Sequence, residues 1–283
     1  MKKTFLVIDI ILLIVLILVF AIPLSMQEIF FFHPNSDENS YIQLKEDNTF
    51  EEIKIQLSNG KTLSGWFAYN ETKEKAPLII YFMGNAQNTS SIMLSFKYTG
   101  CFDYFNGFHV LAIDYPGYGL SEGRIKSDDD FLNPTVEIYD WAKNNEYVDK
   151  DNIIIMGYSI GTGAATYLCS QRDVKGLILL APYDEALSLY NKNFNIFYGP
   201  LTNLTTFKLR SKEYAKSIKA PVLIFSSKDD EVISYEFSKN LSSNFSNLEE
   251  FVTLENVSHS LYLSRSNVWD RIKSFIHDKV SMN

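Results

Sequence analysis

The sequence predicts an α/β fold in which helices cover both faces of a mostly parallel sheet of eight strands. Short apolar runs rich in β-branched residues alternate with helix-compatible segments through most of the chain, as in buried parallel strands joined by crossover helices. A hairpin signature around Asn59-Gly60 precedes this alternation, so the first two strands are expected to be antiparallel. The strands are expected at residues 51–57, 62–69, 77–82, 108–113, 152–156, 174–181, 221–225 and 250–254.

The segments between these strands predict the other elements of one domain, residues 51–283, which follows a lead-in at residues 23–50. One segment interrupts the alternation, and we expect it to form a short lid at about residues 183–217. Helices are expected at residues 89–105, 134–147, from about 160 to 168, 235–245 and 261–279.

The N-terminal stretch predicts a membrane anchor. Residues 5–22 are almost wholly apolar, with Asp9 as the one charge. A helix of this length nearly spans a bilayer, and Asp9 lies close enough to its end to reach the interface. We therefore expect a single transmembrane helix and a membrane partner.

The orientation of that anchor follows from its flanking charges. Lys2 and Lys3 precede the apolar stretch, and basic flanks stay in the cytoplasm. Residues 1–4 are therefore expected inside and the rest of the chain outside the cytoplasm. The alternative is a cleaved signal peptide, with Val19 and Ala21 forming its cleavage site.

Charge and cysteine content exclude several other partners. The formal net charge is −8 and the pI is about 5.1, with no run of Lys or Arg, so nucleic acid is not an expected partner. Cys101 and Cys169 lie far apart without Cys-x-x-Cys spacing, and the four histidines are scattered. The sequence thus predicts no disulfide, no metal site and no cofactor.

A Gly-x-Ser-x-Gly motif, Gly157 to Gly161, ends the strand expected at residues 152–156. Because a helix-compatible segment follows, the motif predicts a sharp strand-to-helix turn with Ser159 at its tip. The glycines would let strand and helix approach closely, and the helix N-terminus would favour negative charge near the serine. A glycine-rich turn without catalytic function is the alternative.

Two further residues complete a candidate catalytic set with Ser159. Asp230 and His259 follow later strands, and the carboxyl ends of parallel strands meet at one edge of a sheet. We expect His259 to be the base that activates Ser159, and Asp230 to fix its tautomer. Asp229 and Asp184 are alternatives for the acid.

The remaining histidines are weaker candidates. His109 precedes a strand core and is expected to be structural, while His33 lies in the lead-in and His277 on the last helix.

The oxyanion hole is expected to use two backbone N–H groups. One is the N–H of Ile160, directly after the serine. The other comes from the turn after Phe82, where Asn85 is the first choice and Ala86 the second.

Several motifs together resemble the α/β-hydrolase superfamily, in its serine aminopeptidase-like branch, which includes membrane-anchored lipases and thioesterases. The matching stretches are Gly84-Asn85-Ala86, Asp114 to Gly119, Gly157 to Gly161, Asp230-Glu231-Val232 and His259. The resemblance implies hydrolysis of a carboxylic ester or thioester through an acyl-enzyme on Ser159. A non-catalytic binding protein and a peptidase of the same fold are the alternatives. One position departs from the family, which usually has histidine where this chain has Met83.

The lid suggests the class of substrate. If its apolar side chains line a wall over the serine, the substrate is an acyl-lipid or small-molecule ester, and the alternative is that they only pack the lid onto the core. The side chains are Tyr190, Phe194, Phe197, Tyr198, Leu201, Leu204 and Phe207.

Overall fold

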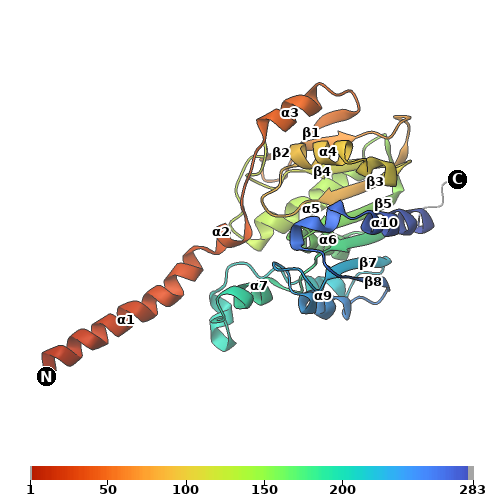
Figure 1. Ribbon diagram of the computed structural model, residues 1–283. Coiled ribbons are helices and arrows are strands. Elements are labelled where there is room, and N and C mark those ends of the chain that lie inside the picture. The colour runs from red at the N-terminus through yellow and green to blue at the C-terminus, as the bar shows by residue number, and fades with distance from the viewer. Residues whose placement is uncertain (1, 280–283) are drawn as a thin grey trace.

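One eight-stranded sheet organises the domain (Figure 1). The computed structural model describes residues 2–279, and within the first helix it describes the side chains of residues 7–15, 17–19, 21, 22, 24 and 25. The strand order is β1-β2-β4-β3-β5-β6-β7-β8. The strands are β1 (Phe50–Gln56), β2 (Thr62–Ala68), β3 (Ala76–Phe82), β4 (His109–Ile113), β5 (Val148–Tyr158), β6 (Gly176–Leu180), β7 (Val222–Ser227) and β8 (Leu248–Leu254).

The pairing of the strands agrees with the sequence prediction. β1 pairs with β2 and β2 with β4 in antiparallel fashion, whereas every other neighbouring pair in the sheet is parallel. A mostly parallel sheet of eight strands is therefore confirmed. Its parallel part brings the carboxyl ends of β3, β5, β6, β7 and β8 to one edge, where sites form in open α/β sheets.

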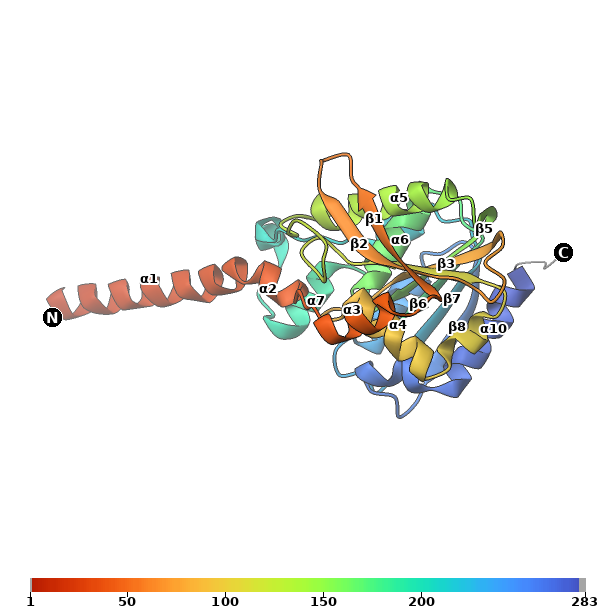
Figure 2. The ribbon, with the colours of Figure 1, turned by 90° about the horizontal axis from the view of Figure 1, so that it is seen from above.

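Helices cover both faces of the sheet. Figure 2 shows α4 and α10 on one side and α5 and α6 on the other. The helices of the domain are α4 (Thr89–Tyr98), α5 (Asp128–Lys143), α6 (Gly161–Gln171), α7 (Ala186–Asn193), α8 (Ser211–Ala215), α9 (Tyr235–Ser242) and α10 (Ser266–Lys279), with 3-10 turns η1 (Cys101–Phe105), η2 (Gly199–Leu204) and η3 (His259–Ser264).

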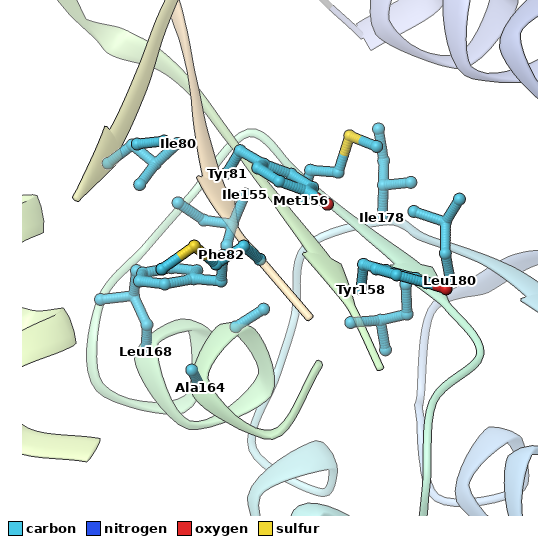
Figure 3. Close-up of a cluster of buried hydrophobic side chains, with 14 of the residues drawn as sticks. Ile80, Tyr81, Phe82, Ile155, Met156, Tyr158, Ala164, Leu168, Ile178 and Leu180 are labelled. Atoms are coloured by element: carbon cyan, nitrogen blue, oxygen red, sulfur yellow. The ribbon is translucent and has the colours of Figure 1, made fainter. Parts of the chain in front are cut away.

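The core lies between the central strands and the helices on each face. Ile155 of β5 and Ile80 of β3 are fully buried, and Ala164 and Leu168 of α6 pack toward them (Figure 3). The run of β-branched residues in β5 is explained by this burial, since a central parallel strand is covered on both sides.

Three predicted helices differ from the observed ones. The helix expected at residues 261–279 begins at Ser266, because the residues before it form the 3-10 turn η3. The helix expected at residues 89–105 ends at Tyr98, because Gly100 has a φ of 72° and starts a separate 3-10 turn. The helix expected from Pro134 begins instead at Asp128, since Ser127 caps it by accepting a hydrogen bond from the Asp130 N–H. Pro134 therefore lies inside α5 rather than at its start.

The N-terminal helix α1 (Lys2–Ser25) projects away from the domain (Figures 1 and 2). The membrane-spanning prediction for residues 5–22 is not supported here: within the described part of the chain, no helix has both the length and the apolar character to cross a membrane. The side chains of Lys2 and Lys3, on which the predicted orientation rests, and residue 1 lie outside the described residues.

The lead-in after α1 is folded onto the domain. It contains two short helices, α2 (Gln27–Phe31) and α3 (Glu38–Lys45). Phe31, Phe32 and Leu44 are buried in the same apolar core as the sheet. Residues 27–45 are thus packed against the α/β domain rather than forming a separate linker.

Candidate active site

Ser159 lies at the turn between β5 and α6. Its φ is 54°, a left-handed conformation that is costly for a residue with a side chain. The two glycines of the motif explain why the turn forms. A Cβ on Gly161 would lie 2.3 Å from the Phe82 carbonyl oxygen, and one on Gly157 would lie 2.7 Å from that of Gly161. The strand-to-helix turn is therefore possible only with glycine at both positions.

The structure brings Ser159, His259 and Asp230 together. The Ser159 Oγ lies 2.9 Å from the His259 Nε2, and the His259 Nδ1 lies 2.8 Å and 3.0 Å from the two Asp230 carboxylate oxygens. Because a carboxylate only accepts hydrogen bonds, Nδ1 carries the proton and Nε2 is free to accept from the serine hydroxyl. This is the arrangement that a histidine base requires.

The Asp230 carboxylate is held by donors that no motif in the sequence predicts. Its Oδ1 accepts hydrogen bonds from the Val232 and Ile233 N–H groups at 2.9 Å and 2.8 Å. Its Oδ2 accepts from the Tyr262 hydroxyl at 3.1 Å, and that hydroxyl in turn accepts from the Ser227 N–H at 2.7 Å. Tyr262 follows His259 by one turn of η3, and only this proximity in sequence hinted at it.

Tyr158 supports the histidine from the other side. Its ring stacks on that of His259, with centroids 5.4 Å apart, and its hydroxyl donates to the His259 carbonyl oxygen. Burial, with a further contribution from the Asp230 charge, raises the pKa of both Tyr158 and Tyr262. Both hydroxyls therefore remain protonated donors at neutral pH.

The alternative acids occupy other positions. Asp229 accepts a hydrogen bond from the Asn256 N–H. Asp184 accepts from the Glu185 N–H, and burial raises the pKa of its carboxyl.

Among the other histidines, His109 is buried. Its Nδ1 accepts from the Asn70 N–H and its Nε2 contacts the Glu74 carbonyl oxygen, while burial lowers its pKa. It has the structural environment expected of it. His277 lies on α10, where its ring contacts Phe108.

The loop after β3 carries the second predicted oxyanion donor. Within residues 2–279, neither the Ile160 N–H nor the Asn85 N–H has a hydrogen-bond acceptor. The Ala86 N–H, in contrast, donates to the Asn85 Oδ1 at 2.9 Å. Of the two candidates in this loop, Asn85 thus has the uncommitted N–H. Met83, at the position where the superfamily usually has histidine, is buried and accepts a hydrogen bond from the Tyr115 hydroxyl at its carbonyl oxygen.

A cavity of about 430 Å³ opens beside the serine. Leu189 is the main apolar side chain that the lid contributes to it, whereas Phe197 is buried elsewhere in the lid. The prediction that the aromatic residues of the lid line this cavity is therefore wrong. They pack the lid onto the domain or face solvent, as Tyr198 does. The apolar lining comes from Phe30, Phe31, Tyr158, Ile160, Leu189, Val232, Ile233 and Leu263.

The described residues contain no cluster of three or more His, Cys, Asp or Glu side chains with the geometry of a metal site. Cys101 and Cys169 are buried free thiols, and burial raises the pKa of both.

Comparison with protein families assigns the chain to the same class of protein that the fold indicates. Residues 77–216 match the family described as the alpha/beta hydrolase fold. Together with the sheet order and the serine turn, this match shows that the chain belongs to the α/β-hydrolase superfamily.

Two kinds of relatives resemble the chain. It is 25% identical over 210 residues to an uncharacterised protein of Mycobacterium tuberculosis, covering 74% of this chain and 72% of that one. It is 30% identical over 227 residues to the lysophosphatidylserine lipase ABHD12 of Rattus norvegicus, covering 72% of this chain. The chain spans only 55% of the length of that lipase.

Solved structures share the fold. The esterase Est1E of Butyrivibrio proteoclasticus, with ferulic acid bound, matches with a TM-score of 0.65 and 20% identity over 80% of this chain and 98% of that one. The Pyrococcus furiosus esterase Pf2001 matches with a TM-score of 0.65 and 17% identity over 88% and 99% of the two chains. At these identities the likeness concerns the fold.

Proposed function

We propose that the protein is a serine hydrolase that cleaves carboxylic esters or thioesters through an acyl-enzyme on Ser159. The observation that carries this proposal is the hydrogen-bonded series Ser159–His259–Asp230 at the mouth of an apolar cavity. The chemical role of each residue follows from the tautomer of His259. The His259 Nε2 takes the serine proton as Ser159 Oγ attacks the carbonyl carbon, and the Asp230 carboxylate stabilises the imidazolium that forms.

The remaining steps use the same groups. The oxygen of the tetrahedral intermediate accepts hydrogen bonds from the Ile160 and Asn85 N–H groups, close to the N-terminus of α6. The imidazolium returns its proton to the leaving alcohol or thiol, which departs and leaves the acyl group on Ser159. A water then attacks with His259 again as base, so that the acid product is released and the serine is regenerated.

A fluorophosphonate probe and Ser159→Ala test this proposal. The protein is expected to hydrolyse p-nitrophenyl butyrate and to label at Ser159. Ser159→Ala should lose roughly 10⁴-fold or more in kcat, as in other serine triads, with an unchanged melting temperature. An unlabelled wild-type protein would support a non-catalytic binding protein, and near-normal turnover by Ser159→Ala would disprove the mechanism.

We propose that the acyl part of the substrate is a lipid-like chain. The cavity is lined mainly by apolar side chains, and its volume lies in the range of small-ligand sites. Similarity to a lysophosphatidylserine lipase also supports an acyl-lipid ester. A peptidase activity is less well supported, since none of the described residues that line the cavity is an Asp or Glu that could bind a cationic peptide amino terminus. Comparing p-nitrophenyl esters with aminoacyl p-nitroanilides distinguishes the two.

We further propose that residues 5–22 attach the protein to a membrane, with the catalytic domain outside the cytoplasm. The support is the apolar surface of α1. Between Val7 and Ile22, the described Leu, Ile and Val side chains are each 47 to 61% exposed, and so large an apolar surface is costly in water.

Fractionation and protease accessibility test this attachment. Full-length protein should stay in the membrane fraction after an alkaline carbonate wash, and a fusion at its C-terminus should be cleaved by protease added outside the cell. Mass spectrometry should find the N-terminal residues still present. A soluble mature chain beginning near Ile22 would instead support the signal-peptide alternative.

A further inference from the structure

The segment of residues 27–35, here called the N-terminal strap, runs from the lid to the loop that carries Asn85. At one end the buried Gln27 side chain accepts a hydrogen bond from the Tyr190 hydroxyl of α7 at 2.8 Å. At the other end Asn35 donates to the Ala86 carbonyl oxygen at 3.1 Å. The N-terminal strap is therefore fixed at one end to the lid and at the other to the loop that carries Asn85.

His33 binds the Asn85 side chain through two hydrogen bonds. The His33 main-chain N–H donates to the Asn85 Oδ1 at 2.8 Å, and the Asn85 Nδ2 lies 2.6 Å from the His33 Nδ1. These contacts join positions separated by 52 residues. They also pair both polar atoms of the amide with one residue, which fixes the amide plane.

The direction of these hydrogen bonds assigns the tautomer of His33. The Asn85 Oδ1 also accepts from the Tyr118 hydroxyl at 3.0 Å and from the Ala86 N–H at 2.9 Å. With three donors around Oδ1, the amide NH₂ must be the group that faces the His33 Nδ1. That nitrogen therefore accepts, and the imidazole is neutral with its proton on Nε2.

The backbone of this loop needs such support. Ala86 has a φ of 57°, a left-handed conformation that is unfavourable for a residue with a Cβ. Conformations of this kind persist only where surrounding contacts hold them. Here the contacts hold both sides of Ala86, because its N–H is bound by the Asn85 side chain and its carbonyl oxygen by Asn35.

We propose that His33 is a positioning residue for the oxyanion hole. By fixing the Asn85 side chain, it sets the orientation of the peptide groups on either side of Asn85, and hence of the Asn85 N–H. The inference rests on the proposed function, since it assigns that N–H to the transition state. It makes the N-terminal strap a part of the active site.

His33→Ala and His33→Asn in the full-length protein test the role of the imidazole. His33→Ala leaves the Asn85 Nδ2 without its acceptor, whereas an asparagine oxygen at position 33 can replace Nδ1. Since a neutral hydrogen bond is lost, kcat for p-nitrophenyl butyrate should fall roughly three- to tenfold in His33→Ala, with KM unchanged. Affinity for an alkyl boronic acid, which forms a tetrahedral adduct on the serine, should fall by the same factor. His33→Asn should recover most of both, and His277→Ala on α10 should change neither.

A double-mutant cycle distinguishes positioning from general support of the fold. Asn85→Ala keeps the backbone N–H but removes the side chain through which His33 acts. The effect of His33→Ala on kcat should therefore disappear in the Asn85→Ala background. The cycle remains informative if His33→Ala lowers the melting temperature, because a purely structural effect would add to that of Asn85→Ala.

Two results would overturn the inference: an unchanged kcat in His33→Ala, or equal losses from His33→Ala with and without the Asn85 side chain. Failure of the proposed function has a different signature, since wild-type protein would then not react with the fluorophosphonate, or Ser159→Ala would keep its activity. If wild-type labels and Ser159→Ala is inactive while His33→Ala matches wild-type, only the role of His33 is wrong.

Discussion

The two sides of the cavity are supported from different parts of the chain. Ser159, Asp230 and His259 lie in the turns and loops that follow β5, β7 and β8, and Tyr262, which donates to Asp230, lies in the same 3-10 turn as His259. The Asn85 loop also follows a strand, but the N-terminal strap holds it from outside the sheet. We infer that the sheet itself fixes the first side, which holds Ser159, Asp230 and His259. Removing one of these side chains should therefore abolish turnover. The second side is adjustable, so changes there should reduce turnover by smaller factors.

The largest effect is expected from the acid on the first side. Asp230→Asn should lower kcat by up to about 10⁴-fold, because an amide NH₂ facing Nδ1 would favour the wrong tautomer of His259. Steady-state kinetics with p-nitrophenyl butyrate measures this. Asp229→Asn is the matched control and should stay within a few-fold of wild-type, as should Asp184→Asn. If Asp184→Asn were the inactive variant, the acid would be misassigned.

The second side has a buried carboxylate of its own, Asp114, directly after β4. It accepts from the Thr89 N–H at 2.7 Å and from the Thr89 hydroxyl at 2.8 Å. Burial raises its pKa to about 6, from an ordinary value of 3.8. The folded protein therefore binds this proton more tightly than the unfolded chain does, and stability should increase as the pH falls from above 6 toward 4.

Comparing the wild type with Asp114→Asn isolates this contribution. When the pH is lowered from 7.5 to 4, the free energy of unfolding of the wild type should rise relative to that of Asp114→Asn by up to about 3 kcal/mol, at 1.36 kcal/mol per pKa unit. Urea denaturation at several pH values measures it, with the exposed Asp151→Asn as control. A difference that stays constant, or that shrinks on acidification, would show that Asp114 has no raised pKa.

A smaller effect is expected for Tyr262→Phe, which removes a partner of the acid. The change leaves the buried Ser227 N–H unsatisfied and the Asp230 Oδ2 with one donor fewer. We expect a loss of about 1–3 kcal/mol in stability and roughly tenfold in kcat. Tyr235→Phe, which loses a hydrogen bond to Thr253 in an exposed setting, should change stability by no more than about 0.5 kcal/mol. Equal effects of the two variants would contradict the role of Tyr262.

The contrast between the side of the cavity formed by strand ends and the side held by the N-terminal strap also explains which parts of the site could be predicted from the sequence. The sheet and the meeting of Ser159, Asp230 and His259 follow from local patterns, namely β-branched runs and polar residues at strand ends. From the sequence, His33 is a weak candidate because it lies in the lead-in, before the first strand. Its role depends on contacts with residues 52 to 85 positions away, Asn85 and Tyr118, which no local pattern encodes. The three phenylalanines before it, Phe30 to Phe32, were the available signal that this segment packs against the domain.

The lid shows the limit of composition as a guide. Its aromatic residues suggested a wall for the substrate, but Tyr190, Phe197 and Phe207 are buried in contacts among the lid, the N-terminal strap and the core. A short insertion has to bury apolar side chains merely to hold its own shape, so few remain for the cavity. Which side of a lid helix faces the substrate is decided by tertiary packing, and the alternative of simple packing holds for the buried residues Tyr190, Phe197 and Phe207.

The smallest effect is expected where the lid meets the cavity. Leu189 of α7 lines the cavity, whereas Phe197 of the same lid does not. If the substrate carries an acyl chain, kcat/KM should rise from acetyl to octanoyl esters, by up to about fourfold per methylene buried at roughly 0.8 kcal/mol each. Leu189→Ala should lower kcat/KM for the octanoyl ester by roughly four- to tenfold and leave kcat/KM for the acetyl ester unchanged. A loss of this size corresponds to about one buried methylene or slightly more.

Phe197→Ala is the matched control for that comparison. It should destabilise the protein by roughly 3–5 kcal/mol through the cavity it creates, and yet keep the wild-type dependence on chain length. Because both variants lose packing, rates should be expressed per active site, counted by fluorophosphonate titration well below the melting temperature. If Phe197→Ala, and not Leu189→Ala, removed the dependence of kcat/KM on chain length, the acyl chain would lie on the other side of α7. A wild-type profile that peaks at acetyl would mean that the cavity holds a small acyl group, and Leu189 would then have no part in substrate selection.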